Sequence, residues 1–327
     1  MSNKKILLSG VKPTGRPHIG NYFGAMRQFV DMQEDYACMF MIADYHTLNF
    51  VQNKEEMAQN ILDLAIDYLA LGLDPQKAII FKQSDVPEHS ELAWIFDTIT
   101  TMPYLQRAHA FKDAEAKNKE ISVGTFNYPM LMAADILIYD ADVVPVGQDQ
   151  KQHVEYARDT VEKFNRIFNC EVFKMPEPKI IEGVAVVPGT DGQKMSKSYG
   201  NTIGLFAELD EIKKAVMSIP TDSKGVDEAK NPEEDNVFKL HKLFADEKQL
   251  AEIREKYEKG GMGYKESKEI LIENIEKFIA PLREKRAQIA SDTDYVLDVL
   301  KEGGKRAKQK AEKKMEEVRD AIGVKLY

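Results

Sequence analysis

The chain has 327 residues, of which 43% are hydrophobic and 30% charged, and its formal net charge is -9 at pH 7. This composition excludes a disordered or fibrous protein, and the length favours two domains, since domains commonly span about 100 to 200 residues. The acidic balance argues against nonspecific binding along DNA or another nucleic acid, although it leaves room for a local basic path to a specific one.

The N-terminal segment MSNKKILLSG contains few apolar residues and no small-residue cleavage site. We therefore expect neither a signal peptide nor a membrane anchor, and a cytoplasmic location. The cysteines, Cys38 and Cys170, lie in apolar stretches without CxxC spacing. This pattern argues against a disulfide framework, a zinc site or an iron-sulfur cluster.

The first half of the chain alternates short apolar runs with longer segments of helical period, which predicts parallel strands joined by crossover helices. The predicted strands are Ile6 to Ser9, Cys38 to Asp44, Ala78 to Val86 and Val143 to Gly147. The predicted helices cover Ile19 to Val30, Glu55 to Leu71, Glu91 to Ala110 and Val154 to Phe168. We expect an α/β fold with a doubly wound parallel sheet, which is a Rossmann-like nucleotide-binding domain.

From about Leu209 the pattern changes to charged amphipathic helices, for example Val237 to Tyr257 and Lys265 to Lys285. We place the boundary at residue 200, with a catalytic domain over 1–200 and a smaller all-helical domain over 201–327. The last helix of the second domain can pack back on the catalytic domain. The polar segment Ser223 to Asn236 is interpreted as a linker or surface loop. Lys301 to Lys314 carries seven basic residues against two acidic ones, which favours a solvated helix face over an RNA contact.

The stretch TGRPHIGNYFGA, Thr14 to Ala25, lies between the first strand and the first helix. Its glycines allow the backbone to approach a ligand closely, and the amides that open the helix favour an anion. His18 is placed to donate a hydrogen bond to a phosphate oxygen. A purely structural glycine turn is about as good an interpretation of this stretch taken alone.

A second glycine-flanked stretch, GQKMSKSYGN, covers Gly192 to Asn201. The chance of five specified residues such as KMSKS is on the order of 1 in 10⁶ per position at ordinary residue frequencies. Two lysines on a loop that glycines leave free to move can close over a triphosphate and neutralise charge on a departing pyrophosphate. Without the first stretch, a solvated surface loop would be the better interpretation.

A third candidate is Asp135, which lies in the apolar run Met130 to Ile138. Tyr128, Met132 and Asp135 share a helix face, and a buried carboxylate needs a partner. An indole N–H, which is a donor only, would satisfy the carboxylate while its rings pack on Met132 and Val144. Capping or pairing of Asp135 within the protein is the alternative.

Together the first two stretches resemble the HIGH and KMSKS signatures of the class I aminoacyl-tRNA synthetases, with HIGN here placing Asn21 at the second histidine. The segments MAADIL and VPVGQDQKQHVE, the GxxPTG opening and TDS at Thr221 to Ser223 resemble the bacterial tryptophanyl-tRNA synthetases. This likeness runs from Ile6 almost to the C-terminus.

The resemblance implies a role for each matching residue. His18, Lys194 and Lys197 would be catalytic. ATP would be bound by Lys12, Thr14, Gly20, Asn21, Gly147, Asp149, Lys194, Met195 and Ser196. Tryptophan would be bound by Leu8, His46, Tyr128, Met132, Asp135, Val144, Val146 and Gln150, with Asp135 at the indole N–H and His46 and Gln150 near the amino and carboxylate end.

The implied function is ligation of tryptophan to its cognate tRNA, tRNA(Trp), through tryptophanyl adenylate, with Mg²⁺ bridging the ATP phosphates and no metal held by the protein alone. The resemblance also implies a homodimer and an anticodon-reading helical domain. Lys12, at a frequent Gln, and Ala114, at a frequent Lys for which Lys112 or Lys117 would substitute, depart from the pattern. The alternatives are a tyrosyl-tRNA synthetase, a noncatalytic paralogue that binds tryptophan or RNA, and a plain adenylyltransferase.

Overall fold

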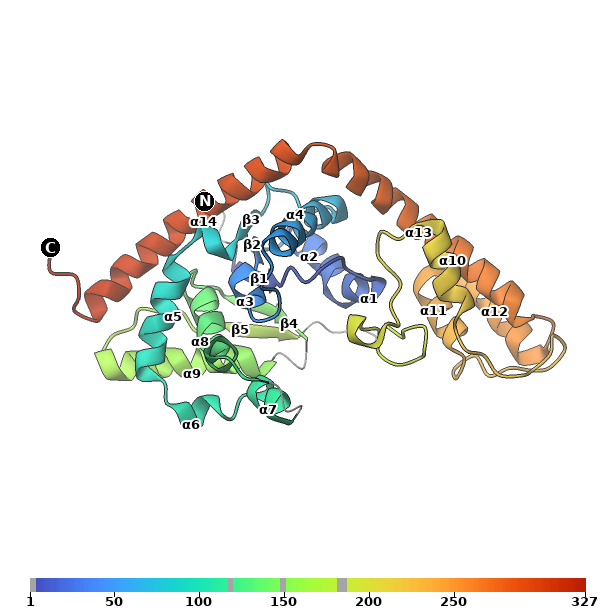
Figure 1. Cartoon of the computed structure of the whole chain (residues 1–327), viewed down its shortest axis with the longest axis horizontal. Helices are drawn as coiled ribbons and strands as arrows, with labels where there is room; N and C mark the ends of the chain where they lie inside the picture. Colours follow the sequence, from blue (N-terminus) through green and yellow to red (C-terminus); the bar gives the residue numbers. More distant parts are fainter. Residues whose placement is uncertain (1–3, 117–119, 148–150, 181–186) are drawn as a thin grey trace. The chain divides into compact units, whose positions relative to one another are not determined.

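The computed structural model of the chain describes residues 4–116, 120–147, 151–180 and 187–327 (Figure 1). The chain forms two compact units. Unit 1 comprises Met1–Gly15, Val30–Glu182 and Asp292–Tyr327, and unit 2 comprises Arg16–Phe29 and Gly183–Ser291.

Unit 1 is built on a sheet of five strands, all parallel, in the order β3-β2-β1-β4-β5. The strands are β1 (Ile6–Val11), β2 (Ala37–Ile42), β3 (Ile79–Lys82), β4 (Val143–Val146) and β5 (Glu177–Ile180). The strand order reverses between β1 and β4, which is where doubly wound sheets bind ligands, at the carboxyl ends of the strands. The predicted doubly wound α/β fold is confirmed.

The helices of unit 1 pack on the sheet or on one another. They are α3 (Asp44–Thr47), α4 (Lys54–Leu71), α5 (Glu88–Ile99), α6 (Met102–Leu105), α7 (His109–Ala116), α8 (Val123–Leu137), α9 (Lys151–Phe168) and α14 (Thr293–Ala321). The predicted limits of α4 are accurate because both ends carry strong signals. The Asn53 side chain accepts a hydrogen bond from the Glu56 amide, and Gly72 ends the helix at φ 107°.

Unit 2 contains α1 (Ile19–Asn21), the π-helical turn η1 (Tyr22–Met26) and helices α10 (Leu209–Met217), α11 (Asn236–Phe244), α12 (Glu247–Lys259) and α13 (Tyr264–Ala290). Helix α2 (Arg27–Met32) continues from η1. Phe23 joins the N-terminal segment to the helices, because its ring lies 5.5 Å from that of Phe244 and 5.6 Å from that of Phe278.

The compact units divide the chain differently from the predicted boundary at residue 200. The turn that contains His18 belongs to unit 2, and α14 belongs to unit 1, where it packs along β3 and α5 (Figure 1). That the helical domain reads the anticodon stays a prediction. In the part of the chain that the structure describes, no helix has the length and apolar character needed to cross a membrane.

Several predicted boundaries are wrong for local reasons. The second strand ends at Ile42, because Asp44 begins α3, and the third ends at Lys82, because Gln83–Asp85 form a 3₁₀ turn, η2. The predicted helix from Glu91 to Ala110 is three helices. Thr100 and Thr101, which have extended backbone, separate α5 from α6, and a second break follows Leu105 before α7 begins at His109.

Two further differences concern the second half of the chain. The predicted helix from Val237 to Tyr257 is two, since the Asp246 side chain caps the start of α12 by accepting from the Gln249 amide. The sequence analysis missed β5, whose residues are half-buried or exposed and include Pro178, a composition typical of an edge strand.

Candidate active site

Asp135 on α8 is the centre of a buried polar cluster in unit 1. Its side chain accepts three hydrogen bonds, from His89 Nδ1 at 2.6 Å and Gln83 Nε2 at 2.8 Å on Oδ1, and from His46 Nε2 at 2.9 Å on Oδ2. The predicted alternative, pairing within the protein, therefore describes part of its environment. A carboxylate has about four acceptor sites. Among the described residues, Oδ2 thus has one acceptor position beyond its bond to His46.

The partners of Asp135 are themselves oriented by other groups. The Tyr139 hydroxyl lies 2.7 Å from His89 Nε2, and burial raises the pKa of that phenol well above its usual range. A protonated phenol can donate to or accept from Nε2, whereas an ionised carboxylate can only accept, so Nδ1 of His89 is the donor toward Asp135. The Gln83 carbonyl accepts from the backbone amides of Tyr45 at 3.1 Å and His46 at 3.4 Å, which turns its NH₂ group toward Asp135.

The electrostatic balance at Asp135 favours its ionised form. Burial raises the pKa of this carboxyl, but the charge of His89 and the hydrogen bonds from His46 and His89 outweigh burial, so that the net pKa lies below its usual range. Asp135 is only 2% exposed. The cluster thus presents a carboxylate that is fixed as an acceptor.

The predicted apolar residues of the tryptophan site lie in the same core. Leu8, Val144 and Val146 are buried members of one hydrophobic cluster, and Met132 packs against it. The Tyr128 ring lies 6.0 Å from that of His46 at an interplanar angle of 79°. Leu8, Val144, Val146 and Met132 thus belong to or pack on the apolar core of unit 1, the unit that also holds Asp135.

Other predicted site residues lie at Asp135 itself, at the surface or outside the described residues. His46, predicted near the amino and carboxylate end of the substrate, has its ring on Asp135 itself. Gly147 is exposed at the carboxyl end of β4, and Asp149 and Gln150 lie outside the described residues.

The turn around His18 is held within unit 2 by two backbone bonds, from the Ile19 amide to the Ile203 carbonyl and from the Leu205 amide to the Pro17 carbonyl, both 3.0 Å. The Asn21 side chain accepts from the His18 amide at 3.0 Å. This bond gives the asparagine of HIGN a local structural role.

The His18 ring is buried and close to a positive charge. Burial, together with the nearby Lys197 ammonium, lowers the pKa of His18 to about 4. Its Nδ1 has no hydrogen-bond partner among the described residues. At neutral pH this histidine is an uncharged imidazole with a nitrogen available to a ligand.

The loop that contains Lys194 and Lys197 is organised by Asn201, which is 2% exposed. The Asn201 side chain accepts from the Ser196 amide at 2.8 Å and donates to the Lys194 carbonyl at 3.1 Å and to Asp191 at 2.7 Å. Both lysine side chains are exposed. The backbone of the loop is thus fixed while its charges face solvent.

Gly20 brings the two motifs together. A Cβ atom at Gly20 would lie 2.8 Å from His18 Nδ1 and 3.3 Å from the Cβ of Met195. Met195 is buried, and its amide donates to the Val187 carbonyl at 2.9 Å. A side chain at position 20 would therefore push against both the histidine and the lysine loop.

The remaining predicted nucleotide contacts lie at the surface of unit 1. Lys12 and Thr14 are exposed, and the Lys12 ammonium lies 4.8 Å from the centre of the Phe50 ring. Of the two lysines expected to compensate for Ala114, Lys112 is exposed on α7 and Lys117 lies outside the described residues. Among the described residues, no group of three or more His, Cys, Asp or Glu side chains is arranged to hold a metal ion.

Sequence reasoning missed four residues of this arrangement: Gln83, His89, Tyr139 and Asn201. The signal for Gln83 was available, because polar residues at the carboxyl ends of parallel strands gather at one edge of the sheet. His89 lies on α5, far in sequence from Asp135 on α8. Tyr139 follows the end of α8 and bonds to His89.

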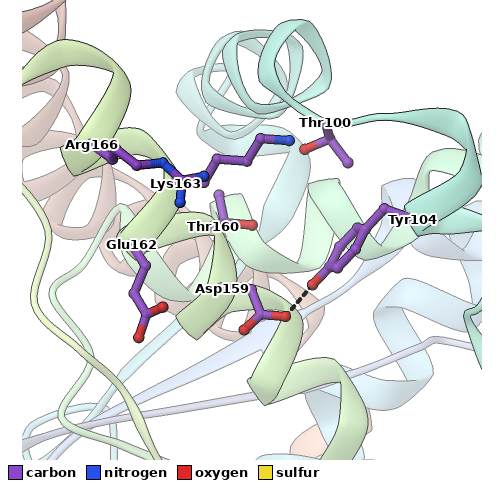
Figure 2. Close-up of a pocket in the computed structure, with 7 residues that line it drawn as sticks. All are labelled: Thr100, Tyr104, Asp159, Thr160, Glu162, Lys163 and Arg166. Atoms are coloured by element: carbon purple, nitrogen blue, oxygen red, sulfur yellow. Dashed lines mark hydrogen bonds between the residues drawn. The ribbon is translucent and has the colours of Figure 1, made fainter.

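A separate pocket of about 200 Å³ lies between α5, α6 and α9 of unit 1 (Figure 2). It is lined by Thr100, Tyr104, Asp159, Thr160, Glu162, Lys163 and Arg166, and the Tyr104 hydroxyl donates to Asp159 at 2.5 Å. None of the predicted site residues lines it.

Comparison with known proteins gives concordant results. Residues 2–280 match the family of "tRNA synthetases class I (W and Y)". The tryptophan–tRNA ligase of Fusobacterium nucleatum subsp. nucleatum is 49% identical over 317 residues, which is 97% of this chain and 97% of that protein.

Solved structures agree with the sequence matches. The tryptophanyl-tRNA synthetase of Campylobacter jejuni complexed with ADP and tryptophan superposes with a TM-score of 0.92 at 45% identity, covering 97% of this chain and 99% of that one. The tyrosyl-tRNA synthetase of Archaeoglobus fulgidus complexed with L-tyrosine has a TM-score of 0.65 at 20% identity, covering 87% and 91%, and shares the fold.

Proposed function

We propose a catalytic role for each of the two units. The premise is that this chain belongs to the class I tRNA synthetases of the tryptophan and tyrosine group. The function is that of a tryptophan–tRNA ligase, at 49% identity to a relative of that activity over nearly the whole chain. The carboxylate of tryptophan attacks the α-phosphorus of ATP, which gives tryptophanyl adenylate and pyrophosphate. The terminal ribose hydroxyl of the tRNA then attacks the acyl carbonyl and releases AMP.

The observation that carries the choice of tryptophan is the acceptor position left on Oδ2 of Asp135. An indole N–H donates one hydrogen bond and accepts none, so it would satisfy this position completely. The phenol of tyrosine would also donate to Oδ2, but its oxygen is an acceptor as well. The N–H groups that His46, His89 and Gln83 direct at Asp135 are already bonded to that carboxylate. An unsatisfied buried polar group costs about 1–3 kcal/mol.

The apolar residues near Asp135 would hold the indole rings. Leu8, Met132, Val144 and Val146 belong to or pack on one core cluster, and burying an aromatic side chain against such a surface contributes about 1.5–3 kcal/mol. Tyr128, Gln150 and Gly147 complete the proposed amino acid and nucleotide contacts in unit 1, together with Asp149, Lys12 and Thr14.

The phosphate chemistry would belong to the turn and loop of unit 2. His18, neutral at pH 7, would donate from Nδ1 to a phosphate oxygen, and the exposed Lys194 and Lys197 would neutralise charge on the departing pyrophosphate. Gly20, Asn21, Met195 and Ser196 would provide backbone close to the nucleotide. Positioning and electrostatics would thus supply the acceleration, without a protein nucleophile.

Magnesium would enter on the phosphates of ATP. The side chains of the two motifs are cationic or neutral, a donor set that fits phosphate oxygens and not a magnesium ion, which prefers carboxylate, water and phosphate oxygens. When bound, the ion would neutralise phosphate charge alongside Lys194 and Lys197. We further propose a cytoplasmic homodimer that binds tRNA(Trp).

Tryptophan- and tyrosine-dependent pyrophosphate exchange, followed by charging of purified tRNA with each amino acid, tests this function. We expect exchange and charging with tryptophan only. Preference for tyrosine would support the other branch of the family. Tryptophan binding without exchange at saturating ATP would support a noncatalytic paralogue, and exchange without charging would support a plain adenylyltransferase.

A further inference from the structure

The seven basic residues from Lys301 to Lys314 fall into three sets: two that contact the rest of unit 1, three that line a pocket, and Lys310 and Lys313, which are exposed outside that pocket. Arg306 and Lys314 face unit 1. The Arg306 guanidinium donates to the Pro75 carbonyl at 3.1 Å, and the Lys314 ammonium lies 2.9 Å from the Asp140 carboxylate and donates to the Val172 carbonyl at 2.8 Å. These two residues anchor α14, and their cationic groups are bonded to other parts of unit 1.

A second set lines a pocket of about 360 Å³ between α14 and the end of β3, both in unit 1. The lining residues are Lys82, Asp85, Leu297, Leu300, Lys301, Gly304, Lys305 and Lys308. Four lysines and one acidic residue thus line the pocket, and the carboxylate of that acidic residue, Asp85, is paired with Lys82 at 2.7 Å. The pocket is strongly cationic in a chain whose net charge is -9.

The position of these lysines is fixed by close packing of the helix on the strand. A Cβ atom at Gly303 would lie 1.8 Å from the Ile80 carbonyl oxygen, and one at Gly304 would lie 2.9 Å from the Cβ of Asp85. Only glycines at both positions allow α14 to approach this closely. Lys82 and the helix lysines therefore share one rigid surface.

The spacing on α14 suits a string of anions. Lys301, Lys305 and Lys308 are separated by four and three residues, so that they lie on one helix face with neighbouring Cβ atoms about 5–6 Å apart, comparable to adjacent phosphates along an RNA strand. Their own acidic neighbours are weak competitors. Lys305 pairs with Glu302 at 2.6 Å and Lys308 with Glu312 at 3.7 Å, and exposed pairs of this kind contribute roughly 0–1 kcal/mol.

We propose that this lysine pocket binds the phosphodiester backbone of the tRNA substrate. RNA is the polyanion that the reaction requires, so the inference rests on the proposed function. Leu297, which is 51% exposed beside the lysines, offers an apolar surface for a ribose edge between phosphates. The pocket recognises charge and not sequence, since phosphate contacts position a nucleic acid without reading its bases.

The first test compares the double variant Lys301→Gln, Lys305→Gln with a matched control, Lys310→Gln, Lys313→Gln, which removes two exposed charges from the same helix outside the pocket. We expect the pocket variant to raise KM for tRNA about tenfold. Its plot of log kcat/KM against log salt should be shallower by about 1 for each RNA phosphate that the protein no longer neutralises. An unchanged KM and slope, or the same changes in the control, would overturn the proposal.

Tryptophan-dependent pyrophosphate exchange without tRNA separates this proposal from the function itself. Both variants should retain full exchange, because no RNA takes part in that step. An enzyme without exchange even as the unaltered chain would refute the proposed function, whatever the lysines do.

Lysine acylation of the unaltered enzyme, read by mass spectrometry, keeps the proposal testable if the variants do not fold. Bound tRNA should protect Lys301, Lys305 and Lys308 and leave Lys310 and Lys313 reactive. Absence of selective protection would contradict RNA binding here. Equal protection by inorganic phosphate at the same phosphate concentration would identify a small-anion site instead.

Discussion

His89 donates from Nδ1 to Oδ1 of Asp135 across 2.6 Å, and both residues are buried. The bond joins α5 to α8, and the Tyr139 hydroxyl holds the imidazole in place through a hydrogen bond to its other nitrogen, Nε2. His89 therefore positions Asp135 and keeps it an acceptor. The two roles can be tested separately, with Asp135 as the proposed contact to substrate and His89 as the residue that positions it.

Replacement of the carboxylate, Asp135→Asn, places an NH₂ group among donors and removes one acceptor. We expect kcat/KM for tryptophan in pyrophosphate exchange to fall on the order of 100-fold, corresponding to about 3 kcal/mol for a charged hydrogen-bonded group. The matched control Asp31→Asn alters an exposed carboxylate on α2 and should leave exchange unchanged. Undiminished selectivity for tryptophan in Asp135→Asn would remove this residue from its proposed role.

Removal of the supporting imidazole, His89→Phe, should make tryptophan binding depend on pH. Without His89, the burial that raises the pKa of Asp135 loses its main opposition, so the carboxylate would protonate as the pH falls. We expect KM for tryptophan to rise several-fold or more as the pH falls from 8 to 6 in His89→Phe, by about tenfold for each pH unit below the pKa of Asp135 in the variant. KM of the unaltered enzyme should not change over this range.

The variant His89→Asn serves as the control for that pH profile, since its amide NH₂ can replace the Nδ1 donor. Its profile should return toward that of the unaltered enzyme. A flat profile in His89→Phe, with loss of kcat alone, would indicate a general packing role.

The close approach at Gly20 predicts a catalytic defect from a single methyl group. In Gly20→Ala the new Cβ would lie within 3 Å of His18 and close to Met195, so the imidazole and the lysine loop must shift. We expect kcat for exchange to fall about 10²-fold, in the range found when one transition-state donor is displaced, with little change in KM for tryptophan.

A suitable comparison is Gly225→Ala, where the new Cβ would meet only the carboxylate end of the flexible Glu228 side chain at 3.3 Å. This variant should keep normal exchange. Normal turnover in Gly20→Ala would show that the turn and the loop tolerate displacement.

Buried histidines predict loss of stability in mild acid. Burial lowers the pKa of His241 to about 4, whereas a histidine in the unfolded chain titrates near 6.5. Between these values the unfolded state binds more protons, so the free energy of unfolding rises with pH and the contribution is complete above about pH 6.5. From pH 7 to 5 the loss should be about 2 kcal/mol for this residue.

The variant His241→Gln, which keeps a donor toward Ser267, should lose correspondingly less stability over that interval. Urea unfolding followed by circular dichroism at pH 5, 6 and 7 measures the difference. An identical pH dependence in the variant and the unaltered chain would contradict the assignment.

Much of the fold can be predicted from local sequence features. The apolar runs predict four of the five strands and the parallel arrangement, because strands buried on both faces must be nearly all apolar. The limits of α4 follow from Asn53 and Gly72. The edge strand β5 and the breaks between helices α5, α6 and α7 gave no comparable periodic signal.

The two motifs with His18 and the KMSKS loop could be recognised from sequence because phosphate chemistry requires glycine, histidine and lysine at short, fixed spacing. Asp135 was recognisable as a carboxylate in an apolar run that needed a partner. The sequence alone left open whether that partner was substrate or protein.

Only the tertiary structure decided how Asp135 is satisfied. His46 lies on α3, Gln83 in η2 and His89 on α5, all far in sequence from Asp135 on α8, and each supplies one donor. The same holds for the lysine pocket, where Lys82 ends β3 and the other lysines lie on α14. Periodicity reports which side of an element is buried, whereas hydrogen-bond direction and charge clustering depend on which elements the folded chain places side by side.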